Sequence, residues 1–98
     1  MAYEIVFTDT AKKHYHSLDG RWRSAVKERI ETHLRHEPAK LSKSRIKRLR
    51  DQKHPEYRLR VDEFRVFYDI DDSTVVIIAI VPKAEAQDWL DEYGIKES

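Results

Sequence analysis

Three arginines stand close together near the middle of the sequence, in a pattern suited to binding an anion. Arg58, Arg60 and Arg65 lie within the segment Tyr57-Arg58-Leu59-Arg60-Val61-Asp62-Glu63-Phe64-Arg65-Val66-Phe67-Tyr68. A guanidinium group is planar, permanently charged and shaped to bind two phosphate oxygens at once. Several such groups on a rigid surface would form an anion site, and nucleic-acid phosphate is the obvious anion.

The residues around these arginines alternate in polarity and predict a β-hairpin with Asp62-Glu63 at its turn. The apolar positions of the first half are Tyr57, Leu59 and Val61, and those that share a face in the second half are Phe64, Val66 and Tyr68. The arginines fall on the opposite face of each strand. The register between the strands decides whether all three arginines share one surface.

The composition indicates one ordinary globular domain spanning residues 1–98. Charged residues make up 38% and hydrophobic residues 40%, which excludes a disordered or a membrane protein. The chain has no cysteine, so a disulfide scaffold and a thiolate zinc site are also excluded. The first residues lead into a strand-like segment and not a signal peptide, and no apolar run is long enough to span a membrane. We therefore expect a cytoplasmic protein.

The net charge of +1 hides a segregation of charges along the chain. Residues 40–60 contain nine Lys and Arg against two acids, whereas residues 84–98 contain five acids against one base. One end of the molecule is therefore expected to be basic and the other acidic. The basic residues of the connector before the hairpin are either phosphate contacts or a plain solvated loop, and they are Lys43, Arg45, Lys47, Arg48, Arg50 and Lys53.

The histidines show no spacing that predicts a metal site, so we expect no metal. Most of them lie on predicted helices and are interpreted as surface or boundary residues. His54 differs because it lies beside the basic hairpin, and imidazole titrates near neutrality. It is a candidate RNA contact and a possible general base.

The remaining elements predict an α+β domain. Residues 3–7 form a strand, a helix runs from the cap at Thr8 to about Leu18, and a longer helix follows the Asp19-Gly20 break and stops before Pro38. Residues 39–55 are interpreted as a connector with one helical turn near 44–49. The apolar run 75–81 is a buried strand, and residues 84–93 form a closing helix that ends at Gly94. The hairpin and this strand make an antiparallel meander that the first strand joins at an edge, with the helices covering one face.

This order of elements, together with the hairpin motif, resembles the RelE/ParE family of toxins from type II toxin–antitoxin modules. The residues that carry the resemblance are Tyr57-Arg58-Leu59-Arg60, Phe64-Arg65-Val66-Phe67-Tyr68-Asp69-Ile70-Asp71 and the apolar strand 75–81. The resemblance spans nearly the whole chain. It implies an N-terminal strand and helical hairpin, a three-stranded antiparallel meander and a short C-terminal helix, a fold also described as microbial-RNase-like.

For the RelE-like branch, the resemblance implies an endoribonuclease that cuts messenger RNA on the ribosome without a metal or cofactor. The 2′-hydroxyl of a nucleotide attacks its own 3′-phosphodiester and leaves a 2′,3′-cyclic phosphate and a free 5′-hydroxyl. Arg65 occupies the position that clamps the scissile phosphate. Arg58 and Arg60 occupy positions where RelE itself has lysines, and as arginines they suit electrostatic stabilisation better than proton transfer. The resemblance also implies a cognate antitoxin, whose acidic tail would cover the basic face in a hetero-oligomer.

The sequence departs from the RelE pattern after the apolar strand. Ala84 stands where these toxins carry an arginine, and no tyrosine stands in register in the closing helix. Lys83 is a substitute as the cationic or acid–base group. Trp89 or Tyr93 would replace the ring that stacks on an RNA base, although Trp89 is also interpreted as a core anchor.

Two alternatives to the nuclease stay open. A ParE-like toxin would block DNA gyrase by binding it, without nuclease chemistry, and the missing arginine and tyrosine favour that reading. A basic RNA-binding domain without toxicity is the third possibility.

Overall fold

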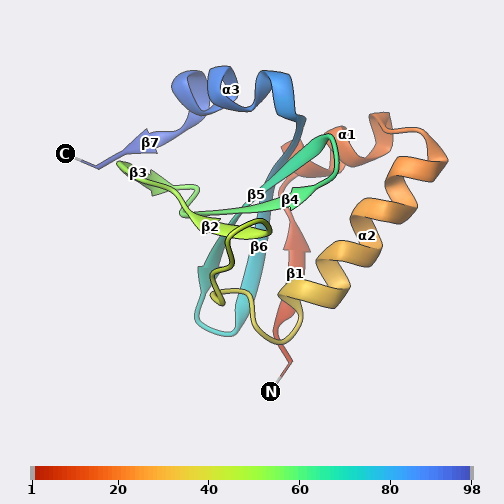
Figure 1. The fold of residues 1–98 in the computed structure, drawn as a ribbon, viewed down its shortest axis with the longest axis horizontal. Coiled ribbons are helices and arrows are strands. Elements are labelled where there is room, and N and C mark those ends of the chain that lie inside the picture. Colours follow the sequence, from red (N-terminus) through yellow and green to blue (C-terminus); the bar gives the residue numbers. More distant parts are fainter. Residues whose placement is uncertain (1, 98) are drawn as a thin grey trace.

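The computed structural model describes residues 2–97 (Figure 1). Four long elements follow the sequence expectation closely: the helices α1 (Asp9–Ser17) and α2 (Gly20–Leu34), and the strands β5 (Phe64–Asp71) and β6 (Thr74–Pro82). The other elements are β1 (Glu4–Phe7), β2 (Ile46–Arg48), β3 (Gln52–His54), β4 (Tyr57–Val61), the 3-10 turn η1 (Lys83–Glu85), α3 (Ala86–Tyr93) and β7 (Ile95–Lys96). None of the helices in this described range is long and apolar enough to cross a membrane.

A five-stranded sheet with the order β1-β6-β5-β4-β2 forms the centre of the fold. Strands β4, β5 and β6 are joined by tight turns and pair antiparallel, as the meander prediction required. Strand β1 lies at the edge and pairs parallel with β6. A parallel neighbour needs a long crossover connection, and the two helices with the rest of the chain provide it.

The helices α1 and α2 form the predicted αα-hairpin. The Thr8 hydroxyl accepts a hydrogen bond from the Ala11 N–H, and the Asp19 carboxylate accepts one from the Trp22 N–H. These caps satisfy backbone donors that a helix leaves free in its first turn. Two residues connect α1 to α2, and α2 runs alongside the sheet (Figure 1).

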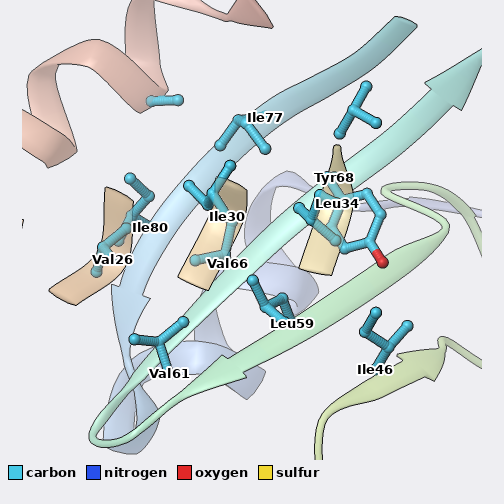
Figure 2. Close-up of a cluster of buried hydrophobic side chains, with 12 residues drawn as sticks. Val26, Ile30, Leu34, Ile46, Leu59, Val61, Val66, Tyr68, Ile77 and Ile80 are labelled. Atoms are coloured by element: carbon cyan, nitrogen blue, oxygen red, sulfur yellow. The ribbon is translucent and has the colours of Figure 1, made fainter. Parts of the chain in front are cut away.

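The main core lies between α2 and one face of the sheet. Figure 2 shows the side chains of α2 directed at alternate residues of the strands. Successive residues of a strand point to opposite faces, so the apolar positions of the hairpin all reach this core. The buried side chains labelled there are Val26, Ile30, Leu34, Ile46, Leu59, Val61, Val66, Tyr68, Ile77 and Ile80.

The expectation that all helices cover one face is wrong. Helix α3 packs on the opposite face, where Leu90 contacts a second buried cluster with Phe67, Ala79 and Val81. The reason lies in β5 and β6, which are apolar on both faces in this region, so two layers of helix are needed to exclude water. Figure 1 shows α3 above the sheet and α1 and α2 beside it.

The connector expectation is also wrong, because residues 46–48 form a strand and not a helical turn. Strand β2 pairs antiparallel with β4, and Ile46 is buried in the main core beside Leu59. Strand β3 pairs with β7 in a separate two-stranded sheet. The edge of β4 has backbone N–H and C=O groups that need hydrogen-bond partners. Pairing with this edge outweighs the weak preference of residues 46–48 for a helical turn.

Candidate active site

The turn of the β4–β5 hairpin sets which side chains face each other. Asp62 adopts a left-handed backbone conformation with φ of 49°, which asparagine and aspartate tolerate better than most residues. With this two-residue turn, Arg60 pairs directly with Arg65, and Arg58 pairs with Phe67. Directly paired residues of an antiparallel ladder point to the same side, so the three arginines share one face. We call Arg58, Arg60 and Arg65 the arginine cluster.

The arginine cluster lies on the face opposite the main core. The alternate residues Leu59 and Val66 are paired with each other and fully buried under α2. Their burial fixes the register, because a slip of one residue would expose the apolar set and bury the arginines. The placement of the three arginines on one face is therefore a consequence of core packing.

Arg65 is held tightly by its own hairpin. Its side chain is only 6% exposed, and Nη1 donates to the carbonyl oxygens of Asp62 and Phe64, at 2.9 Å each. Burial, and next the charge of Arg60, lower the pKa of Arg65. Such a group loses little conformational freedom when it binds an anion, because its position is already fixed.

Arg58 is partly buried and incompletely satisfied. Its Nε is buried and has no hydrogen-bond partner. Burial lowers the pKa of Arg58, and the charges of Arg65 and then Arg60 lower it further. Among the residues that the structure describes, no carboxylate forms an ion pair with any arginine of the cluster. The cluster therefore holds positive charge that an anion would stabilise.

Two predicted lysines lie next to the cluster. Lys83 follows β6 directly, and its backbone N–H donates to the carbonyl of Glu63 at 2.7 Å, which ties it to the hairpin turn. Lys47 on β2 pairs with Arg58 and therefore faces the same side. Both lysine side chains belong to exposed residues. The structure thus places cations on both sides of the cluster.

Helix α3 brings aromatic rings to this face. Trp89 is half-buried and stacks on Phe67 with ring centroids 5.4 Å apart, which fits the core-anchor interpretation. Tyr93 packs against Trp89 and is 61% exposed, so its ring is the more accessible of the two. Ala84, which the sequence analysis placed at the expected arginine position, lies in η1 and is exposed.

The comparison with protein families decides what kind of protein carries this site. The model of the ParE toxin of type II toxin–antitoxin systems (parDE) matches residues 5–87. The chain belongs to the RelE/ParE family of type II toxins. Comparison with the curated proteins gave no match.

Solved structures of related toxins agree with this assignment. A chain of the toxin–antitoxin complex RelBE2 from Mycobacterium tuberculosis is 32% identical to the toxin and superposes on it with a TM-score of 0.70. The match covers 84% of the toxin and 99% of the RelBE2 chain. A mutant of Escherichia coli RelE in the free state is 26% identical over 94% of each chain, with a TM-score of 0.58. A chain of the RelE–RelB complex from Pyrococcus horikoshii shares the fold at 23% identity, covering 85% of the toxin and 97% of its own length, with a TM-score of 0.68.

Apart from Arg45, which lines a cavity with Arg60, the other predicted basic residues of the toxin do not gather at the cluster. Arg48 is ion-paired to Glu56 at 2.7 Å. His54 Nδ1 lies 2.8 Å from the carboxylate of Asp69, which also accepts the Glu56 N–H. Asp69 is four residues along β5 from Arg65, or roughly 13 Å. Exposed positions outside the β4–β5 hairpin are taken by Lys43, Arg50 and Lys53.

The sequence analysis missed one cation near the cluster. Arg29 of α2 approaches Asp62 to 4.0 Å and lies at a cavity that Arg45 and Arg60 also line. Its position within a helix with the expected apolar spacing gave no signal, because only tertiary packing brings it to the hairpin. No group of three or more His, Asp or Glu side chains within residues 2–97 is arranged to hold a metal ion.

Proposed function

We propose that this toxin is a messenger RNA endoribonuclease that acts in the cytoplasm, where it cuts messenger RNA in the ribosomal A site and stops translation. The observation that supports it best is the convergence of Arg58, Arg60 and Arg65 on one face of a rigid sheet, without carboxylate partners in the described chain. Such an array is suited to the extra negative charge that develops on a phosphodiester under attack.

In the proposed reaction the RNA supplies its own nucleophile. The 2′-hydroxyl gives its proton to solvent water and attacks the adjacent phosphorus. The bond to the 5′-oxygen breaks, which leaves a 2′,3′-cyclic phosphate, and the 5′-oxygen takes a proton from Lys83. Arg65 clamps the phosphate, and Arg58 and Arg60 stabilise the five-coordinate intermediate. Lys83, tied to the hairpin turn through its backbone, serves as the general acid, because its ammonium group carries a proton that it can donate to the leaving oxygen, whereas an arginine keeps its protons. The side-chain cations take the electrostatic part that a metal ion plays in other nucleases.

RNA ends mapped after brief induction test this function. Wild-type toxin should produce cleavage aligned with codons, and Arg60→Ala should reduce it about 100-fold or more, because a preorganised charge is lost. Arg60 is the exposed member of the cluster, so its replacement leaves the fold intact. Arg48→Ala is the matched control, since it also removes one exposed arginine but lies outside the cluster. Codon-aligned cleavage by Arg60→Ala at the wild-type level would exclude the proposed site.

A second candidate function is inhibition of DNA gyrase by binding. Ala84 at the position of the missing arginine favours it, as does the match to the ParE family model. The two functions differ in which process stops first after induction. Arrest of protein synthesis before DNA replication supports the nuclease, and the reverse order supports gyrase binding.

A cognate antitoxin is the expected partner in either case. The toxin resembles chains solved as toxin–antitoxin complexes, and its arginine cluster lacks internal counter-charges among residues 2–97. An acidic, amphipathic segment of the antitoxin would neutralise this face and keep RNA away.

A further inference from the structure

A basic cavity lies beside the arginine cluster, between α2, the loop before β2, and β4 with the turn that follows it. It has a volume of about 330 Å³ and is lined by Arg29, Ser44, Arg45, Arg60 and Asp62. We call it the flanking cavity. Arg60 belongs to both the flanking cavity and the arginine cluster, so the two sites are continuous.

The backbone fixes the walls of the flanking cavity. The Arg60 N–H donates to the Arg45 carbonyl at 2.8 Å, which continues the β2–β4 pairing by one residue. The Ser42 hydroxyl accepts the N–H groups of Arg45 and Ile46 at 2.9 and 3.1 Å, and so orders the loop before β2. Three cations from α2, β4 and this loop are thereby held around one space.

The charges in the flanking cavity do not cancel. The single carboxylate, Asp62, is 4.0 Å from Arg29, and both side chains are substantially exposed, at 53% and 39%. Such a pair is weak, and it leaves Arg45 and Arg60 without a partner among the described residues. The charges of Arg45 and Arg29 reach the neighbouring His33, whose pKa is lowered by burial first and then by these two arginines.

The geometry points to a backbone phosphate of the RNA strand, next to the scissile linkage, as the ligand of the flanking cavity. A phosphodiester offers several acceptor oxygens, and guanidinium forks with a serine hydroxyl are suitable donors for it. One bound water occupies about 30 Å³ of liquid volume, so the cavity has room for a hydrated phosphate group. This inference rests on the proposed nuclease function, because it takes the strand to run on from the arginine cluster through Arg60.

Binding of an uncleavable RNA measures this contact directly. The probe is a short 2′-O-methyl oligoribonucleotide with a fluorescent label, titrated with purified toxin at several NaCl concentrations. For each of Arg45→Ala and Arg29→Ala, the slope of log K (the association constant) against log salt concentration should be less negative than for wild type by about 0.7 units. This is the value for one phosphate contact of a single strand. Asp62→Asn should bind more tightly than wild type, because it removes the only negative charge of the cavity and asparagine tolerates the same backbone conformation.

Lys27→Ala is the matched control. Lys27 is an exposed cation of α2, as Arg29 is a cation of the same helix, but it lines a different groove. Its replacement should leave the salt slope unchanged. Equal slopes for Arg29→Ala, Arg45→Ala and Lys27→Ala would overturn the inference. Arg45→Gln, which keeps a polar side chain at this exposed position, repeats the test if Arg45→Ala folds poorly.

Two further outcomes separate this inference from its alternatives. If Arg29→Ala and Arg45→Ala weaken the binding of a labelled oligoglutamate peptide but leave RNA binding unchanged, the cavity serves an acidic protein partner and the inference is wrong. RNA-end mapping of Arg60→Ala tests the proposed function independently. Cleavage that is lost in Arg60→Ala while Arg29→Ala and Arg45→Ala bind like wild type would reject the flanking phosphate and keep the nuclease.

Discussion

At Arg58 the sheet buries a guanidinium nitrogen without giving it a hydrogen-bond partner. Core packing alone would not select this arrangement, because an unsatisfied buried donor costs about 1–3 kcal/mol. Burial makes the largest contribution to the lowered pKa of Arg58. The neighbouring charges of Arg65 and then Arg60 lower it further, because like charges repel. Strain of this kind is expected where a site is prepared for a ligand of opposite charge.

Replacement of Arg58 should therefore separate stability from activity. Arg58→Met keeps a side chain of similar length and removes both the orphan donor and the repulsion. We expect the free energy of unfolding to rise by about 1 kcal/mol, measured by urea denaturation, and toxicity to be lost. Arg48→Met is the control, because Arg48 forms an ion pair with Glu56 and should gain nothing on replacement. Destabilisation of Arg58→Met would contradict this account.

Tyr68 shows the opposite situation, a buried polar group that is fully used. It is completely buried, and its hydroxyl donates to the Pro38 carbonyl at 2.6 Å, which fastens the chain after α2 to the sheet. Burial, and next Tyr57, raise the pKa of Tyr68, so it stays protonated and keeps this donor. The contact explains why the connector leaves α2 in a defined direction.

Tyr68→Phe should lower the free energy of unfolding by about 1–2 kcal/mol, because it leaves the Pro38 carbonyl without its partner. Tyr57→Phe is the matched change, since Tyr57 stacks on Tyr68 but is only half-buried. We expect it to have less than half the effect. Equal losses in the two variants, measured by urea denaturation, would mean that the buried Tyr68 hydroxyl contributes no more to stability than the half-buried hydroxyl of Tyr57.

At the scale of elements, the sequence predicted those whose apolar pattern is strong. The β4–β5 hairpin and α2 were both predicted because alternation and helical spacing are local properties of the chain. Strand β2 was missed because only one of its three residues, Ile46, is buried, and three residues are too few to show a period. Its existence depends on the free edge of β4, which is a property of the assembled sheet.

The position of α3 follows from the same distinction. The apolar run in β6 indicated that both faces of the strand are covered, but not which element covers the second face. The structure gives that role to α3, where Leu90 and Trp89 pack on Phe67. The helix that carries the two candidate stacking rings, Trp89 and Tyr93, thus also covers the second face of the sheet.

The contribution of this packing can be measured at Trp89. Trp89→Ala should lower the free energy of unfolding by about 2 kcal/mol, below the 3–5 kcal/mol that fully buried aromatics show, because Trp89 is half-buried. Amide hydrogen exchange should accelerate in α3 and not in α2. Tyr93→Ala removes the more exposed ring and should leave both quantities nearly unchanged. Uniform acceleration throughout the chain would show that α3 does not dock as an independent element.

At the scale of the whole molecule, the site depends on tertiary register more than on sequence proximity. The sequence placed Arg58, Arg60 and Arg65 in one hairpin, and only the Arg60–Arg65 pairing brings them to one face. Arg29 lies far from them in sequence and could not be included, because its approach to Asp62 depends on how α2 crosses the sheet. Conversely, His54 is close in sequence but is held by Asp69 away from the turn. The residue types were therefore enough to predict a cationic site, but not which residues belong to it.

Stability of the whole fold should also depend on pH, through His14. Its Nδ1 accepts the Ile80 N–H at 3.1 Å, where β6 extends beyond its pairing with β1. Burial lowers the pKa of His14, so the folded state favours the neutral ring, whereas the unfolded chain takes up a proton near pH 6.5. Stability is therefore fully present above pH 6.5 and declines as pH falls towards the folded pKa. His33, whose pKa is also lowered by burial, acts in the same direction.

Urea denaturation between pH 7.5 and 5 measures this decline, which cannot exceed about 1.4 kcal/mol per pH unit for each histidine. His14→Asn should make the curve flatter, because the amide oxygen can accept the same N–H without titrating. Glu31 affects a different range: its hydrogen bond to Arg35 lowers the pKa of the carboxyl below its usual value of 4.5, so its contribution is lost only at more acidic pH. Retention of the full pH dependence in His14→Asn would show that the strand edge is not closed by the neutral imidazole, and would leave His33 as the group responsible.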